Sequence, residues 1–184
     1  IGAAVNAAAA GDTITVASGT YTENVLINKS LTLSGSGAVI DGNGAGVVVV
    51  ITANNVTLEG FTIQHSGSDA QTHAGVGLLW AQGCTVRNNT IHNNVHGIAL
   101  MSAKNNLIRN NTISTNTVYG LVLEAYASTP NVASTGNTIT ENVISGNGRD
   151  GIYAGKDQNN NQYLENTITG TIGLEVSGDF EGNG

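Results

Sequence analysis

One short phrase recurs along the second half of this chain, and the repetition constrains the fold more than any other feature. The phrase is a polar pair, a Thr or Val, an Ile, a few polar residues, and then a Gly followed by alternating apolar residues. The copies are Asn88–Ile91 with Gly97–Leu100, Asn110–Ile113 with Gly120–Leu123, Glu141–Ile144 with Gly151–Ala154, Glu165–Ile168 with Gly173–Val176, and a weaker Gly60–Ile63 with Gly77–Trp80. Each copy therefore predicts one structural unit of a repeat protein.

The spacing of the copies identifies the kind of repeat. The Thr or Val column falls at positions 62, 90, 112, 143 and 167, which gives periods of 28, 22, 31 and 24 residues. A propeller blade of four strands needs about 40 residues, whereas about 22 residues hold three short strands and three turns. Apolar residues alternate with polar ones in short runs, which is the pattern of half-buried strands. The sequence thus predicts an all-β protein, a right-handed parallel β-helix built as a solenoid of three-strand coils.

Aligning the copies predicts which side chains point inward, because equivalent residues in adjacent coils should stack about 4.8 Å apart. The first inward column is Leu58, Val86, Ile108, Ile139 and Tyr163, and the second is Ile63, Ile91, Ile113, Ile144 and Ile168. The third is Leu78, Ile98, Leu121, Ile152 and Leu174, with Trp80, Leu100, Leu123, Ala154 and Val176 two positions further on. The core is therefore expected to consist of ladders.

Two columns of asparagine are predicted at the corners of the coils. Asn tolerates left-handed backbone angles and hydrogen-bonds nearby backbone groups, so stacked Asn side chains are expected to bridge one coil to the next. One column is Asn89, Asn111, Asn142 and Asn166, and the other is Asn106, Asn137 and Asn161. Cys84 takes the place of an Asn in the second column, and we expect it to be a buried thiol.

Composition limits the classes of function. The chain has 184 residues, of which 10% are charged and 40% hydrophobic, so we expect one folded domain over residues 1–184. The net charge of −7 argues against a nucleic-acid partner, because phosphate binding needs a basic surface. The sequence has no run of about 20 apolar residues, so no membrane span is predicted.

The predicted domain divides into a cap, first coils and regular repeats. Residues 1–12 are the predicted N-terminal cap, because Ile1–Ala9 is the one helical candidate and a helix there would cover open strand edges. Residues 13–58 are predicted to form the first coils and residues 59–178 the regular repeats. A C-terminal cap is expected to be absent. The strands expected in the first coils are Thr13–Val16, Tyr21–Ile27, Leu31–Ser34, Val39–Asp41, Val47–Thr52 and Val56–Leu58.

The stretch Ala3–Asp41 carries a more specific pattern: Ala-Ala-Val-Asn, Gly-Asp-Thr-Ile-x-Val, Thr-Tyr-x-Glu-Asn-Val and Asn-Lys-Ser-Leu-Thr-Leu. With the later Asn-Asn-Thr-Ile and Gly-Ile copies, it closely resembles secreted parallel β-helix repeat proteins of the pectin-lyase-like superfamily. That superfamily includes pectate lyases, mannuronan epimerases, a periplasmic maturation protein for a copper enzyme, phage tailspikes and surface-layer proteins. The resemblance implies a secreted, periplasmic or cell-surface protein. It leaves the activity open, because function lies in the site and not in the fold.

Two insertions interrupt the regular coils. Ser66–Ala74 lengthens the corner before the Gly-Leu strand, and Ala125–Ser134 lengthens the corner after that strand in a later coil. Long loops on a rigid scaffold commonly carry function. In the lyases that this sequence resembles, the sheet between such loops lines the substrate groove. The two insertions are therefore predicted to be the walls of a groove.

Polar residues of the same sheet form the candidate site. An enzyme that cleaves or epimerises a uronic acid must neutralise its carboxylate, remove the adjacent proton and reprotonate a carbon. The predicted catalytic residues are Arg149 as the neutralising cation, with His96 and Tyr119 as acid and base. The predicted substrate-binding residues are Glu124, Asp150, Tyr153, Lys156 and His73, and Glu175 lies near the same face.

No cofactor or metal is predicted. The four histidines, His65, His73, His92 and His96, gather near one corner. Imidazoles can bind copper, but no Cys or carboxylate completes a recognisable ligand spacing here. Calcium is equally unsupported, because the predicted outward centre of the sheet is the apolar set Leu79, Ala99 and Val122. The Asp-Pro-His signature of mannuronan epimerases is also absent.

Two classes of function remain. The first is an extracellular or cell-surface β-helix that engages polysaccharide along this sheet, in its enzymatic form a lyase or C5-epimerase of an acidic polysaccharide. The second is a structural or assembly module of a surface layer, stalk or fibre, which associates with further copies through an uncapped C-terminal coil. The polar groove residues favour the first class, whereas sparse charge and the predicted apolar stripe favour the second. The sequence leaves open whether the protein is an enzyme.

Overall fold

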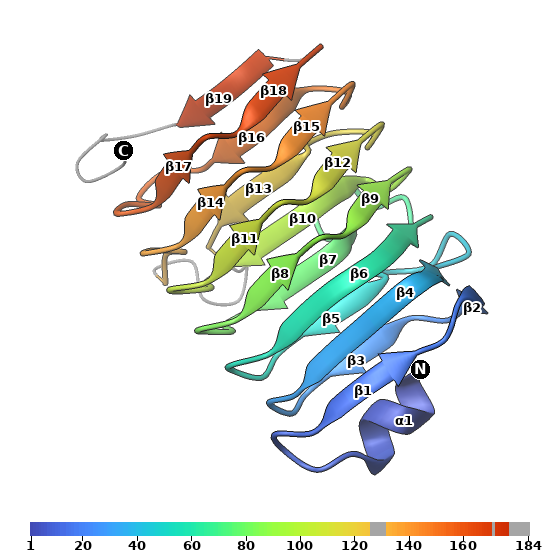
Figure 1. Cartoon of the computed structure of the whole chain (residues 1–184). Helices are drawn as coiled ribbons and strands as arrows, with labels where there is room; N and C mark the ends of the chain where they lie inside the picture. The colour runs from blue at the N-terminus through green and yellow to red at the C-terminus, as the bar shows by residue number, and fades with distance from the viewer. Residues whose placement is uncertain (126–131, 171, 177–184) are drawn as a thin grey trace.

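Short strands in parallel register make up nearly all of the regular structure (Figure 1). The computed structural model describes residues 1–125, 132–170 and 172–176. Within these residues nineteen strands follow one short helix, α1 (Gly2–Ala7). The coils advance along one axis from the N-terminal helix and wind right-handed (Figure 1), the usual hand of parallel crossovers. The predicted all-β, right-handed parallel β-helix is confirmed.

The strands form three faces. Two faces join into one twelve-stranded sheet through the long strands β4 (Thr32–Asp41) and β6 (Thr57–Gln64). The first face also contains β1 (Thr13–Val16), β8 (Thr85–Arg87), β11 (Leu107–Arg109), β14 (Thr138–Thr140) and β17 (Gln162–Leu164). The second also contains β2 (Gly19–Thr22), β9 (Thr90–His92), β12 (Thr112–Ser114), β15 (Val143–Ser145) and β18 (Thr167–Thr169).

The third face is a separate seven-stranded sheet, and it carries the candidate site. Its strands are β3 (Val25–Ile27), β5 (Val49–Ile51), β7 (Ala74–Leu79), β10 (His96–Met101), β13 (Leu121–Glu124), β16 (Asp150–Ala154) and β19 (Ile172–Val176). Every described neighbour pair in it is parallel. Each coil contributes one strand to this sheet, so residues that are far apart in sequence lie side by side on a single surface.

The core consists of ladders, as predicted. Val86 pairs with Ile108 and Ile108 with Ile139 on the first face, and Ile91 pairs with Ile113 and then Ile144 on the second. These six side chains are fully buried. Each aliphatic side chain thus packs on its equivalent in the next coil, and burial of this kind stabilises by about 25 cal/mol per Å² of apolar surface.

The predicted register of the third column is wrong for one coil. Leu78 pairs with Leu100 and not with Ile98, whose partner is Val76. Trp80 lies beyond the end of β7 and is 40% exposed, instead of pointing inward. The repeat glycine of this coil is Gly75, since a Cβ there would lie 2.8 Å from Ile91 Cγ2, inside the core.

The two-residue shift in the register of β7 also changes which side chains lie next to each other on the outer face of the sheet. Gly77, and not Leu79, stands beside Ala99, and Val122 follows in the next coil. Leu79 belongs to the neighbouring column, next to Met101. Gly75 and Gly77 are two residues apart, so both registers preserve the alternation of inward and outward side chains. The sequence pattern alone could not choose between them.

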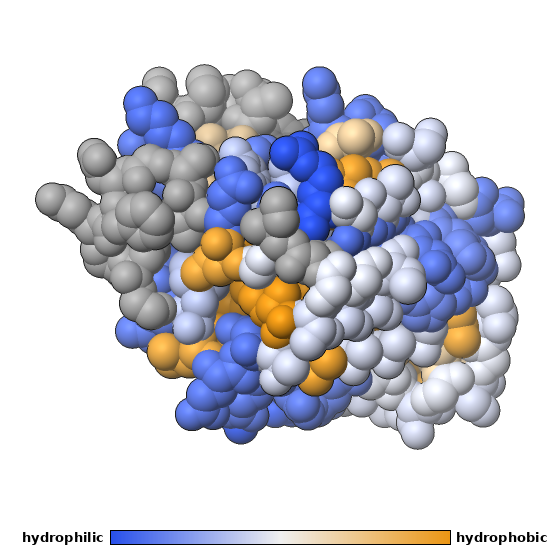
Figure 2. Space-filling view, turned by 90° about the horizontal axis from the view of Figure 1, so that it is seen from above, coloured by the Kyte–Doolittle hydropathy of each residue, from blue (hydrophilic) through white to orange (hydrophobic). Residues whose placement is uncertain are grey.

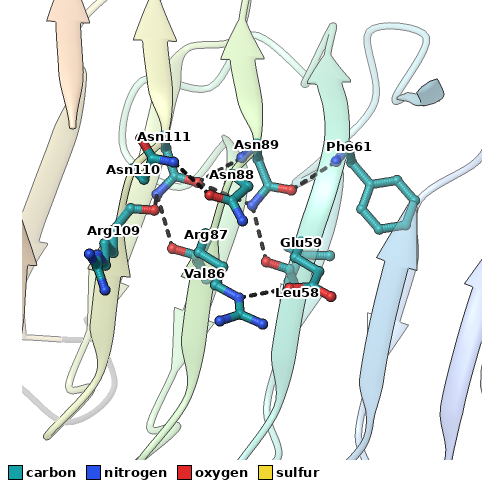
Figure 3. A network of polar contacts seen from close by, with 10 residues as sticks. All are labelled: Leu58, Glu59, Phe61, Val86, Arg87, Asn88, Asn89, Arg109, Asn110 and Asn111. Carbon is teal, nitrogen blue, oxygen red and sulfur yellow. Dashed lines mark hydrogen bonds and ion pairs between the residues drawn. The ribbon is translucent and has the colours of Figure 1, made fainter. Parts of the chain in front are cut away.

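Both predicted asparagine ladders are present, and Figure 3 shows Asn89 and Asn111 of the first one. Asn111 Oδ1 accepts a hydrogen bond from the Asn89 backbone N–H at 3.1 Å, and Asn111 Nδ2 donates to the Val86 carbonyl at 2.9 Å. Asn106 makes equivalent bonds to Cys84 N–H and to the Ala81 carbonyl. Cys84 is a free, buried thiol, as expected.

A third ladder was missed in the sequence. Asn94, Asn116 and Asn147 are buried, and Asn116 Oδ1 accepts from Asn94 N–H while Asn147 Oδ1 accepts from Asn116 N–H, both at 3.0 Å. Each residue follows the Asn of the first ladder by five positions. That constant offset was a readable signal. This ladder lies at the corner that leads into the seven-stranded sheet.

The N-terminal part agrees with the prediction except in its strand boundaries. Helix α1 covers the first coil, with Val5 buried against the core. The predicted strand Tyr21–Ile27 is two strands, because the chain turns a corner at Glu23–Asn24 between β2 and β3. The two strands predicted within 31–41 are one, β4, with a register shift between Ser34 and Ala38. The expected absence of a C-terminal cap falls on residues 177–184, which lie outside the described residues.

No helix among the described residues has the length and apolar character to cross a membrane.

Candidate functional site

A groove of about 870 Å³ runs over the outer face of the seven-stranded sheet. Residues Ala70–His73 of the first insertion form one wall, as predicted. The second insertion contributes Ala125 to the lining, and its residues 126–131 lie outside the described residues. The groove therefore sits where the two insertions flank the sheet.

The floor of the groove is apolar. A small buried cluster of Ala74, Ala99, Met101 and Val122 lies apart from the main core, and Leu79 packs against it. In the hydropathy view, apolar side chains gather in restricted patches within a mostly hydrophilic surface (Figure 2). From the sequence, the apolar stripe of Leu79, Ala99 and Val122 favours an assembly module over a binding groove. In the structure the stripe is the floor of the groove.

Three aromatic rings stack beside the groove; His96 and Tyr119 line it, whereas Tyr153, a predicted substrate-binding residue, is not among the lining residues. The His96 and Tyr119 ring centroids are 5.2 Å apart, and the Tyr119 and Tyr153 centroids are 4.8 Å apart, with nearly parallel planes. Because β10, β13 and β16 are successive strands, Tyr119 lies between the other two rings. Tyr119 is thus flanked by two rings, and it lines the groove. Burial raises the pKa of that hydroxyl, although the Arg149 charge acts in the opposite direction.

Arg149 supplies a positive charge at this aromatic ladder. Its guanidinium carbon lies 5.3 Å from the Tyr119 ring centroid, within the range of a cation–π contact. The side chain is exposed and lines the groove. None of the ion pairs that join described residues uses it. Arg149 is therefore placed to meet an anionic group of a ligand.

His96 is held from both sides. Its Nε2 lies 2.8 Å from the Ala70 carbonyl, and its Nδ1 lies 3.4 Å from the Tyr119 backbone nitrogen. A carbonyl only accepts and a backbone N–H only donates, so the ring is neutral, with its proton on Nε2. Burial lowers the pKa of this imidazole, against a smaller opposite effect of the Ala70 bond. An acid or base role for His96 would require one of these bonds to break.

Glu124 is the groove carboxyl with a perturbed pKa. It ends β13, beside the apolar floor, and burial raises its pKa. Sequence reasoning gave it a substrate-binding role only. A carboxyl whose pKa is raised in a groove is a candidate for proton transfer.

The remaining predicted residues divide into two groups. His73 lines the groove, and its Nδ1 accepts a hydrogen bond from the Asp69 backbone N–H at 3.0 Å. Lys156 is exposed and is not among the residues that line the groove. Asp150 is only 1% exposed, and its Oδ2 has no hydrogen-bond partner among the described residues. The predicted column of His96, Tyr119 and Asp150 thus holds along the backbone, but the Asp150 side chain is not a lining group.

The histidines do not assemble a metal site. No group of three or more His, Cys, Asp or Glu side chains converges in the described parts of the chain. His65 Nδ1 instead pairs with Asp41 Oδ2 at 2.9 Å, and His96 bonds to the insertion loop. These side chains therefore make other contacts and do not form a ligand set for copper or zinc.

Comparison with known proteins gives similarity at two levels. A cell surface glycoprotein of Methanothermus fervidus is 41% identical over 85 residues, which are 45% of this chain and 13% of that protein. The chain therefore spans a small part of this much longer relative. Among solved structures, the A-module of the Azotobacter vinelandii mannuronan C-5 epimerase AlgE6 has a TM-score of 0.72 at 18% identity, covering 95% of this chain and 52% of that one. An alginate lyase from Paenibacillus sp. has a TM-score of 0.68 at 17% identity, covering 94% and 72%.

At such identities, the likeness to solved structures shows the parallel β-helix fold. The family-level match is more extensive. The model of the family described as "Periplasmic copper-binding protein (NosD)" matches residues 5–183, nearly the whole chain. The protein therefore belongs to the periplasmic copper-binding protein (NosD) family.

Proposed function

We propose that the protein is a β-solenoid of the cell envelope that binds an acidic polysaccharide in the groove of its seven-stranded sheet. The observation that carries the proposal is Arg149, an exposed cation without an ion-pair partner among the described residues, fixed over the Tyr119 ring at the groove. A guanidinium is suited to paired hydrogen bonds with a carboxylate. The net charge of −7 makes such a cation stand out on this surface.

The rest of the groove suits a sugar chain. The apolar floor can pack against the C–H groups of a pyranose, and the edges of the aromatic ladder offer polar groups to its hydroxyls. The family description and the name of the M. fervidus relative support an envelope location.

A second candidate function is chemical conversion of the bound polymer, as a lyase or C5-epimerase. Glu124 favours it, because a raised pKa in the groove suits a group that exchanges protons with substrate. In this version Arg149 neutralises the uronate, and Tyr119 and Glu124 act as acid and base. Because both His96 ring nitrogens already make hydrogen bonds, this version assigns no acid or base role to His96. Because three metal donors do not converge among the described residues, the proposal contains no copper chemistry, although the family description names that metal.

The test uses alginate, the acidic polymer suggested by the names of two structural neighbours. Calorimetric titration with alginate oligosaccharides should give binding that Arg149→Gln weakens about tenfold, the loss of one charge-assisted hydrogen bond. Lys156→Gln is the matched control, because it removes an exposed cation outside the groove and should leave affinity unchanged. Equal affinity of the wild type and Arg149→Gln would remove the groove from the proposal.

Two further readouts separate the alternatives. Ultraviolet absorbance of unsaturated product reports a lyase, and a proton spectrum of the recovered polymer reports an epimerase. If the polymers do not bind and light scattering finds sugar-independent assemblies, the protein is an assembly module instead.

A further inference from the structure

The wall of the groove has few connections to the rest of the molecule. The insertion loop is anchored at its ends, where Gly67 N–H donates to the Gly46 carbonyl at 2.8 Å and the His73 carbonyl accepts from His96 N–H at 3.3 Å. Between these anchors, Asp69 braces the loop internally through Gln71 N–H and the Thr72 hydroxyl. The loop is therefore a preformed unit whose position depends on what holds its middle.

His96 supplies that hold. Among described residues, the bond from His96 Nε2–H to the Ala70 carbonyl is the hydrogen bond that joins residues 68–72 to the body of the solenoid. The same ring accepts from Tyr119 N–H and stacks on the Tyr119 ring. One side chain, 3% exposed, thus connects the wall of the groove to its aromatic ladder.

The geometry points to His96 as the positioning residue of the groove: its neutral ring ties loop 66–73 to Tyr119 and so sets the width that an acidic polysaccharide enters. The identity of the ligand in this inference rests on the proposed function, whereas the connection between the loop and His96 rests on the hydrogen bonds alone. It replaces the acid or base role predicted for His96 from the sequence.

Protonation of the ring would break this arrangement. A proton on Nδ1 would face the Tyr119 N–H donor, and the new charge would stand near the Arg149 cation over the same Tyr119 ring. The other titratable side chains that line the groove are His73 and Glu124, and Asp69 lies beside His73 on the loop. The link from the ring to Tyr119 should therefore hold above the lowered pKa of His96 and be lost as the pH falls through it, whereas the Nε2–H bond to the Ala70 carbonyl favours the protonated ring and persists.

Two substitutions separate the tether from the ring. The amide nitrogen of His96→Gln occupies nearly the place of Nε2 and keeps a donor for Ala70, whereas His96→Asn is too short to reach Ala70. Both variants lose the ring that stacks on Tyr119, so a difference between them isolates the tether. His92→Asn is the control, since His92 lies in the same coil but on the second face.

The measurement is backbone ¹⁵N relaxation of the whole chain, without and then with alginate oligosaccharides. In His96→Asn, order parameters of residues 68–72 should fall from about 0.85 to below about 0.6, with a loss of affinity of about tenfold. His96→Gln and His92→Asn should resemble the wild type. A loop equally rigid in His96→Asn would overturn the inference. A loop that loosens in a protein that never binds alginate would support the tether and reject the proposed ligand.

Discussion

At the scale of single residues, asparagine side chains satisfy backbone groups that the corners of the solenoid leave without strand partners. Asn111 accepts a hydrogen bond from the Asn89 N–H and donates one to the Val86 carbonyl, and both partners lie in the preceding coil. A buried donor or acceptor without a partner costs about 1–3 kcal/mol. Three ladders therefore contribute to stability in every coil that they cross, and hydrogen bonds, not only apolar packing, hold the coils in register.

Cys84 offers a direct test of this account. Its thiol accepts from Val56 N–H at 3.4 Å and donates to the Ala53 carbonyl at 3.3 Å, the two contacts that an Asn makes elsewhere in the ladder. Cys84→Asn should therefore be neutral or stabilising by about 1 kcal/mol, whereas Cys84→Ala should destabilise by about 1–3 kcal/mol because Val56 N–H loses its partner. Urea unfolding measures both. If Asn proved as damaging as Ala, the thiol would not be a substitute for the ladder side chain.

At the scale of the strand, the repeat glycine fixes how the seven-stranded sheet meets the second face. A Cβ on Gly120 would lie 2.5 Å from the Gly151 carbonyl oxygen and 2.6 Å from Ile144 Cγ2. These distances are shorter than real Cβ contacts, so only glycine allows the corner to close over the isoleucine ladder. The Gly-Ile element of the repeat therefore has a steric origin.

Substituting this glycine should be costly. Gly120→Ala forces a methyl group against backbone and a buried isoleucine, and overpacking of this kind costs about 1–3 kcal/mol or more. Gly173→Ala, in the same column of the last described coil, is the control, because a Cβ there meets no atom of the described residues within 4 Å. Thermal unfolding should show a lower midpoint for Gly120→Ala and almost none of that effect for Gly173→Ala. Similar midpoints for the two variants would contradict the steric explanation.

At the scale of the whole molecule, the solenoid has two separate apolar clusters, the core inside the coils and the floor of the groove. The core ladders lie inside the coils, while the floor of the groove lies on their outer face. Ionisable groups on that outer surface pay a desolvation penalty that core residues, being uncharged, do not. The groove therefore contributes to the pH dependence of stability through Glu124.

Glu124 sets the sign of that contribution. Its pKa is raised in the folded state, so the folded protein binds the proton more tightly than the unfolded chain does. Its contribution to stability is present below the unfolded pKa and is lost as the pH rises through the folded pKa. Glu124→Gln should therefore stabilise the protein against urea at pH 8 and have little effect near pH 4. Equal effects at both pH values would indicate that the carboxyl is not desolvated.

The sequence by itself determined the architecture, because a repeat near 22 residues with alternating apolar positions fits a three-strand coil, and the ladders follow from stacking equivalent residues. It also located the sheet and insertions that form the groove, with Arg149, Tyr119 and His73 among the residues that line it. Tertiary structure decided the register of β7, since two glycines two residues apart leave the same alternation. It alone determined that His96 bonds Ala70, that Asp150 is buried and that Glu124 is desolvated. These outcomes depend on contacts between coils and with an insertion loop, and distances between segments remote in the chain are not encoded in a local pattern.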